Sequence, residues 1–151
     1  MSYLDFKIEC CLAYGIRTPG LLEIKYHNPK KKNALQPETY IKLAELFERA
    51  NKDDKIKVVV LHGGEFYSAG NDLSGFLKFA NSDPSEIRKN ASAGVQDGMV
   101  RVINALINFE KAFVAVVRGG CVGITCTMLT LADFIYCTPE AYFTTPFMSS
   151  F

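Results

Sequence analysis

Short apolar segments alternate with amphipathic ones along most of the chain. Two of them, residues 56–61 and Phe113–Val117, are rich in β-branched residues and short enough to be buried strands. Leu22, Ile24 and Tyr26 alternate with polar neighbours, which is typical of a half-buried strand. Because strand-like and helix-like stretches follow each other in turn, the pattern predicts an α/β fold with mainly parallel strands.

Three helices are expected between these strands. The first begins near residues 36–38, where proline and an acid suit a first turn. A second ends near Asn108, and a third runs from about Gly123 through Ala132. The expected inner faces are Tyr40, Leu43, Ala44 and Phe47 in the first helix, and Val100, Ile103, Leu106 and Ile107 in the second.

The remaining segments complete a single-domain prediction over residues 1–151. Residues 3–12 and 21–26 are expected to be strands joined by a hairpin loop through Gly15 to Gly20. Residues 81–85 are typical of a loop, and two short strands are expected at 134–137 and 142–144. The last residues lack a closing helix, so we expect a core domain that is incomplete at its carboxyl end.

Composition excludes several classes of function. The formal net charge of +1 gives no reason to expect a nucleic-acid partner, and no stretch is long and apolar enough for a membrane span. The five cysteines have neither zinc spacing nor a C-x-x-C motif, which favours reduced, mostly buried thiols in an intracellular compartment and no metal. No targeting signal is readable at the amino terminus.

Two glycine-bearing turns follow the apolar strands and carry the candidate chemistry. One is His62–Phe76, reading HGGEFYSAGNDLSGF, and the other is Arg118–Asp133. Both place small residues and unpaired backbone amides at the carboxyl end of a strand, where open α/β folds bind ligands. We expect the two turns to face each other. Two amides aimed at one point can stabilise the negative charge that a carbonyl oxygen gains in an enolate-like transition state.

The two turns together resemble the crotonase superfamily, also called the enoyl-CoA hydratase/isomerase family, and within it most closely the Δ3,Δ2-enoyl-CoA isomerases. The resemblance covers nearly the whole chain, from the Leu22 strand to Pro146–Phe147. It is carried by Lys32–Leu35, Phe66–Leu73, Gly119–Ile124, Ala132–Asp133 and Phe143–Phe147.

The resemblance implies a set of site residues. The backbone N–H groups of Asn71 and Ile124 would form the oxyanion hole, each directly after a turn glycine, Gly70 or Gly123. Coenzyme A would be met by the basic loop at Lys31, Lys32, Asn33 and Ala34, because lysines bind phosphates as point charges. The acyl-thioester and pantetheine path would be lined by Ser68, Ala69, Asp72 and Leu73. Asp133 would have a structural role.

The departures from the family pattern bear on the reaction. The hydratases use two glutamates, and Thr127 stands at the position of the first. The isomerases keep a later glutamate, beyond the Thr-Pro-Phe segment, and no such residue lies within the 151 residues. Glu65 and Glu140 are expected to be solvated. The chain therefore has an expected oxyanion hole and no identifiable base.

The resemblance implies a crotonase-like spiral of repeated ββα units, here its amino-terminal core without the carboxyl-terminal helices. The implied activity is isomerisation of 3-enoyl-CoA to trans-2-enoyl-CoA in fatty-acid β-oxidation, in the mitochondrial matrix or the peroxisome, by a homotrimer. Coenzyme A is part of the substrate, and no other cofactor is implied. The alternatives are a catalytically inactive, crotonase-like subunit of a larger assembly, or an acyl-CoA binder.

Overall fold

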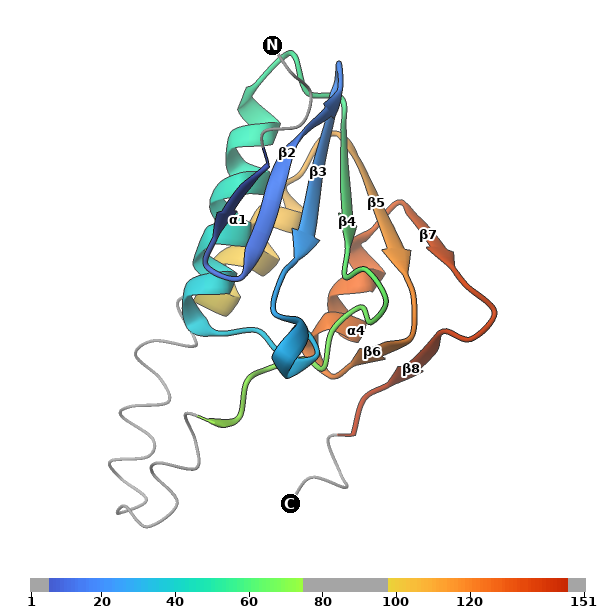
Figure 1. Cartoon of the computed structure of the whole chain (residues 1–151). Helices are drawn as coiled ribbons and strands as arrows, with labels where there is room; N and C mark the ends of the chain where they lie inside the picture. Colours follow the sequence, from blue (N-terminus) through green and yellow to red (C-terminus); the bar gives the residue numbers. More distant parts are fainter. Residues whose placement is uncertain (1–5, 75–97, 147–151) are drawn as a thin grey trace, which may run out of the picture.

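A six-stranded mixed sheet is the framework of the protein (Figure 1). The computed structural model describes residues 6–74 and 98–146. The strand order is β1-β2-β3-β4-β5-β7, and β6 pairs with β8 in a separate two-stranded sheet. The strands are β1 Lys7–Glu9, β2 Leu12–Thr18, β3 Leu21–Tyr26, β4 Val58–His62, β5 Ala112–Val117, β6 Gly120–Val122, β7 Phe134–Cys137 and β8 Tyr142–Thr144.

The sheet changes from antiparallel to parallel pairing at β3. β1, β2 and β3 form an antiparallel meander, whereas β3, β4, β5 and β7 are parallel to one another. The predicted parallel-dominated α/β arrangement is confirmed. Because β4 and β5 are parallel neighbours, the segments that leave their carboxyl ends begin side by side.

Helix α1, Pro37–Lys52, packs on one face of the sheet, close to helical residues 98–107 (Figure 1). The four expected inner residues of α1 are completely buried, which confirms the predicted helical face. Phe47 makes edge-to-face contacts with Phe109 and Phe113, with ring centroids 5.0 Å apart in each pair. These rings join α1, the end of the second helix and β5 in a single core.

The first hairpin was placed wrongly by the sequence pattern. Residues 3–12 are not one strand, because the chain reverses at Cys10 and Cys11 between β1 and β2. Both cysteines adopt positive φ angles, 50° and 61°, a conformation that few residues other than glycine adopt. The turn between β2 and β3 lies at residues 19–20 as expected, but Gly15 lies inside β2.

Two helix predictions also need correction. In the second helix, Leu106 is buried and Ile103 packs against the core as predicted, but Val100 and Ile107 are 58% and 60% exposed, and Val102 is buried without having been predicted. The third helix is shorter than predicted, because α4 covers Ile124–Met128 and a 3-10 turn, η2, covers Leu129–Leu131. The predicted loop at 81–85 lies outside the described residues.

The thiols are less buried than predicted. Only Cys121 is buried, and burial raises its pKa to about 12. Cys11 and Cys126 are partly exposed, and Cys10 and Cys137 are exposed. Among the described residues, no helix is both long enough and apolar enough to cross a bilayer.

Candidate active site

The two glycine-bearing turns meet at the carboxyl ends of β4 and β5. We call residues 63–72 the first turn and residues 118–124 the second turn. Ser68 N–H donates to Gly120 O at 3.1 Å, and Val122 N–H donates to Ser68 O at 3.0 Å. A Cβ on Gly70 would lie 2.6 Å from Val122 O, so the two backbones touch at this point. The expectation that the turns face each other is confirmed.

Asn71 follows the glycine of the first turn, and its N–H is held away from the basic loop. Leu35 N–H donates to Gly70 O at 2.7 Å, and Asp72 N–H donates to Leu35 O at 2.8 Å. Because the peptide group is planar and trans, the Asn71 N–H points opposite to the Gly70 carbonyl, and therefore away from Leu35. Within residues 6–74 and 98–146, this N–H has no hydrogen-bond partner.

Ile124 opens helix α4 in the second turn, and its N–H is directed by the same principle. Gly123 O accepts hydrogen bonds from Cys126 N–H and Thr127 N–H, at 3.0 and 3.2 Å, and so points into the helix. The Ile124 N–H therefore points out of the helix amino terminus, where amides lack intrahelical partners. In the described part of the chain, it too has no hydrogen-bond partner.

The Asn71 N–H points toward the second turn. Leu35 pairs with Asn71 on one edge of the first turn, while Ser68 pairs with Cys121 on the other edge. The first turn thus lies between the basic loop and the second turn, and a Cβ on its Gly70 would lie 3.7 Å from the Cα atom of Gly123, the residue before Ile124. Gly123 itself is fixed from a fourth segment, because its N–H donates to Thr144 O of β8 at 2.8 Å.

The basic loop supports the first turn from behind. Its 3-10 turn, η1, covers Pro29–Lys31, and Lys32 and Asn33 follow in the left-handed conformation with φ angles of 48° and 56°. Ala69 N–H donates to Lys32 O at 2.8 Å. The Lys32 ammonium lies 5.5 Å from the centroid of the Phe66 ring, a cation–π contact.

Asp72 is a paired carboxylate beside the free amide. Its Oδ2 atom accepts hydrogen bonds from Lys31 Nζ at 2.8 Å and Gln36 Nε2 at 3.3 Å, and its Oδ1 atom accepts from Ser74 N–H. The bond from Lys31, followed by those involving Ser74, holds the pKa of Asp72 well below its usual range. Asp72 is therefore ionised at neutral pH, and Lys31 is already paired.

A hollow of about 290 Å³ lies beside the basic loop. Its lining includes Lys25, His27, Lys32, Glu65 and Phe66. It combines two cationic side chains with an aromatic wall, and these are groups that can contact phosphate oxygens and a flat ring.

The other residues expected to line the substrate path differ in exposure. Ser68 is completely buried and Asn33 is 4% exposed, and both bond to backbone groups of the protein. Ala34 is also buried at 9% exposure, whereas Ala69 is partly exposed and Leu73 is 57% exposed. Their contact with a substrate stays a prediction.

Asp133 has the structural role expected from the sequence, and Glu65 and Glu140 are solvent-exposed as expected. Asp133 Oδ2 accepts a hydrogen bond from Phe113 N–H at 2.8 Å, which fastens the start of β7 to β5. Glu65 and Glu140 are exposed. Thr127 is exposed, and its hydroxyl donates to Ile124 O within α4 at 2.8 Å.

Sequence reasoning missed two supporting side chains of the site, Tyr40 on α1 and Gln36, which caps the amino terminus of that helix. Tyr40 OH donates to Asn71 Oδ1 at 3.5 Å, and Gln36 bonds Asp72. The sequence pattern places Tyr40 on the inner face of the first helix and Gln36 at its start, and it indicates no contact of either residue with the first turn. A tyrosine on an inner helical face is one available signal, because a buried hydroxyl needs a partner.

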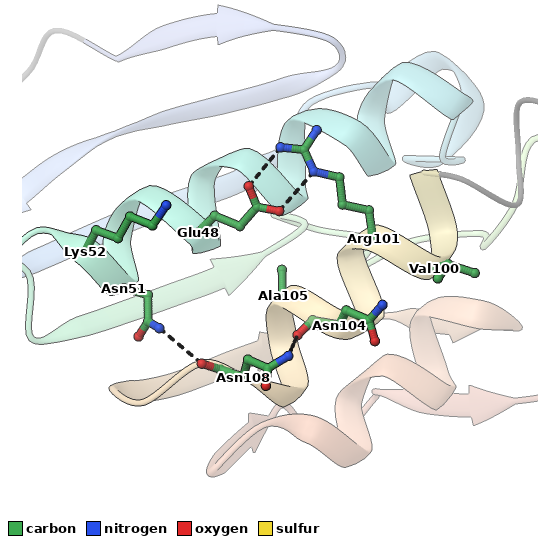
Figure 2. A pocket seen from close by; sticks show the side chains of 8 residues that line it. All are labelled: Glu48, Asn51, Lys52, Val100, Arg101, Asn104, Ala105 and Asn108. Atoms are coloured by element: carbon green, nitrogen blue, oxygen red, sulfur yellow. Dashed lines mark hydrogen bonds and ion pairs between the residues drawn. The ribbon is translucent and has the colours of Figure 1, made fainter.

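A second hollow, of about 560 Å³, lies between α1 and helical residues 98–107 (Figure 2). Its polar lining is largely self-paired: Glu48 and Arg101 form a two-armed ion pair at 2.8 and 2.9 Å, and Asn51 Nδ2 donates to Asn108 O. Asn51 Oδ1 also accepts from Glu110 N–H. These bonds fasten the two helices together.

Comparison with known proteins places the chain in a family. The model of the family described as enoyl-CoA hydratase/isomerase matches residues 17–150, so the chain belongs to this family. The chain is 37% identical over 128 residues to human enoyl-CoA delta isomerase 2, covering 85% of this chain and 32% of that protein. It is 33% identical to mouse peroxisomal enoyl-CoA delta isomerase 3, covering 85% of this chain and 39% of that protein.

The solved structures agree on the fold. An enoyl-CoA hydratase/isomerase from Pseudoalteromonas atlantica superposes with a TM-score of 0.74 at 32% identity, covering 91% of this chain and 50% of that one. The crotonase-like fold expected from the sequence is confirmed. The chain spans about a third of the length of the two isomerases and half of the length of this structure.

Proposed function

We propose that the protein is a Δ3,Δ2-enoyl-CoA isomerase that holds the thioester oxygen of its substrate between the N–H groups of Asn71 and Ile124. The observation that carries this proposal is the pair of backbone amides, each free within the described residues, on two turns in direct contact. Membership of the enoyl-CoA hydratase/isomerase family and similarity to two delta isomerases support the substrate class.

The amides act on the charge that develops during the proton shift. A base removes a proton from C2 of the 3-enoyl thioester, and the electron pair of that C–H bond moves onto the thioester oxygen as an enolate. The two N–H groups donate to this oxygen, and they need no reorganisation because the backbone already fixes them. Return of the proton to C4 moves the double bond to C2–C3, with atoms and electrons balanced.

The proton carrier is not among the groups described above. Asp72 is paired with Lys31, and Asp133 bonds the backbone of β5. The family resemblance implies that a glutamate beyond the Thr-Pro-Phe segment carries the proton, and the isomerase activity is proposed for a protein that contains such a glutamate. Coenzyme A is expected to extend over the basic loop, where the hollow beside Lys32 carries cationic groups.

Substitution of Ile124 tests the proposal sharply. Ile124 is the first residue of α4, a position where proline is tolerated because its missing N–H has no intrahelical partner. Ile124→Pro therefore removes one proposed donor with the helix retained, and Ile124→Val keeps the donor as a matched control. We expect Ile124→Pro to lower kcat for 3-hexenoyl-CoA roughly 100- to 1,000-fold, as for other lost oxyanion-hole donors.

Three outcomes separate the candidate functions. Conversion of 3-enoyl-CoA by the wild type, lost in Ile124→Pro and kept in Ile124→Val, supports the isomerase. Thioester binding without conversion across chain lengths supports the acyl-CoA binder and contradicts the isomerase. Neither conversion nor binding, with copurification of other proteins, supports a structural subunit.

A further inference from the structure

We propose that Asn33 and Ser68 act as positioning residues, which set the direction of the Asn71 N–H through the backbone. This inference rests on the proposed function, because it concerns the same oxyanion hole. Both side chains are buried, with exposed fractions of 4% and 0%. Asn33 lies behind the first turn and Ser68 lies within it, and in the described part of the chain both side chains bond only to backbone groups.

The side-chain amide of Asn33 forms hydrogen bonds with several carbonyl groups of the first turn. Its Nδ2 atom donates to Gly63 O at 2.8 Å and Phe66 O at 2.7 Å, with Tyr67 O at 3.3 Å. Its Oδ1 atom accepts from Asn28 N–H at 2.9 Å, which anchors Asn33 in its own loop. One side chain thus connects the basic loop to both ends of the bend that leads out of β4.

Ser68 continues this connection to the residue before the proposed donor. Its hydroxyl donates to Asn33 O at 2.7 Å and accepts from Gly70 N–H at 3.1 Å. The peptide group that contains Gly70 N and the one that contains Asn71 N share the Gly70 Cα. Gly70 has a φ of 83° and no Cβ, so its backbone is intrinsically free to rotate. The bond from Gly70 N–H to Ser68 Oγ limits that rotation on one side.

The bond from Leu35 N–H to Gly70 O limits rotation on the other side. With both flanking peptide groups fixed, the Asn71 N–H has one direction, toward the second turn. The residue types suit this work: an amide offers two donors and one acceptor at Asn33, and a hydroxyl both donates and accepts at Ser68. A donor displaced by about 1 Å can cost on the order of 100-fold in rate.

The test is the carbonyl stretching frequency of a bound thioester, measured by infrared difference spectroscopy. The probe is hexanoyl-CoA labelled with ¹³C at the thioester carbon, which binds without reacting. In the wild type, two well-aligned N–H groups should lower the ¹³C=O frequency relative to the free thioester. Ser68→Ala removes one oxygen atom from a buried site and leaves the Ile124 donor in place, so its bound probe should return part of the way to the free frequency.

Asn33→Asp gives an independent variant of nearly the same shape, in which the two amide donors are lost. The matched control is Asn104→Asp, because Asn104 is exposed and lines the hollow between α1 and helical residues 98–107, outside the first turn (Figure 2). For the complete gene product, Ser68→Ala should lower kcat roughly tenfold to 100-fold with KM changed less than about threefold. If Ser68 had a purely structural role, Ser68→Ala would lower the melting temperature and leave kcat per folded molecule unchanged.

The outcomes distinguish this inference from the proposed function. No frequency change in the wild type, with the probe bound, would overturn the oxyanion hole itself. A wild-type change that Ser68→Ala fully retains would overturn the positioning role and leave the oxyanion hole intact. Should Asn33→Asp fail to fold, Ser68→Ala alone decides the matter.

Discussion

At the residue scale, Gly70 controls how closely the two turns approach. It combines a φ of 83° with a backbone contact in which a Cβ would lie 2.6 Å from Val122 O. Gly70→Ala should therefore destabilise the fold by more than the roughly 1–3 kcal/mol that a left-handed conformation costs. Urea unfolding measures this, with Gly64→Ala as control, because Gly64 has a φ of 79° but faces only the flexible Lys25 side chain. Equal losses in the two variants would contradict the close approach.

Asp72 predicts an acid-sensitive contribution to stability. Its pairing with Lys31 lowers the folded-state pKa below the unfolded value of about 4. The stabilisation is therefore complete above about pH 4 and is lost as the pH falls through the folded-state pKa. Asp72→Asn should be less stable than wild type at pH 7, and the difference should shrink as the pH falls below about 4. Urea midpoints across pH measure this, and parallel curves for the two proteins would contradict it.

The two turns that carry the proposed donors could be predicted from sequence, because each places a glycine after a buried strand. The choice of Asn71 and Ile124 as the donors came from the family resemblance. The burial of Asn33 and Ser68 could not be predicted in this way. Both are polar residues in turns, where solvent exposure is the ordinary expectation, and only the folded chain shows their buried bonds.

At the element scale, α1 connects the core to the site. One face of the helix buries Phe47 against the second helix and β5, while Gln36 and Tyr40 at its start bond Asp72 and Asn71. The helix therefore fixes the first turn in place relative to the core. Its amphipathic period made both its existence and its inner face predictable.

Phe47→Ala should cost about 3–5 kcal/mol of unfolding free energy, because it empties a fully buried site between two rings. Ile41→Ala, on the same helix at 38% exposure, is the matched control and should cost about 1 kcal/mol or less. Chemical denaturation measures both. A similar small loss in each would show that α1 does not depend on this ring cluster.

Elements were mispredicted where tertiary contacts override local signals. The turn at Cys10 and Cys11 uses left-handed backbone without glycine, asparagine or proline to indicate it. In the second helix, Val100 and Ile107 are apolar yet exposed, so hydrophobicity alone assigned these two positions wrongly to the inner face. In both places the sequence contains no local cue to the observed structure.

At the scale of the whole molecule, the parallel pairing of β3, β4, β5 and β7 brings the two turns to one edge of the sheet. This arrangement followed from the alternation of strands and helices. Partners, compartment and trimer formation follow from family resemblance, and they remain proposals for a chain that spans about a third of the length of its isomerase relatives.

For the whole molecule, we predict that isomerisation is faster than hydration. Thr127 stands where the family resemblance places the first hydratase glutamate, and a hydroxyl cannot serve as a carboxylate base. The complete gene product should therefore hydrate trans-2-hexenoyl-CoA to 3-hydroxyhexanoyl-CoA much more slowly than it isomerises 3-hexenoyl-CoA. Liquid chromatography of the products measures this. Hydration as fast as isomerisation would contradict the proposed reaction.

The central claim is that the N–H groups of Asn71 and Ile124 bind the thioester oxygen. The most direct measurement is the ¹H–¹⁵N spectrum of the protein during titration with hexanoyl-CoA, with coenzyme A itself as the control that lacks the carbonyl. We expect both amide protons to move downfield with hexanoyl-CoA and not with coenzyme A. A thioester that binds while both amide signals stay in place would contradict the account.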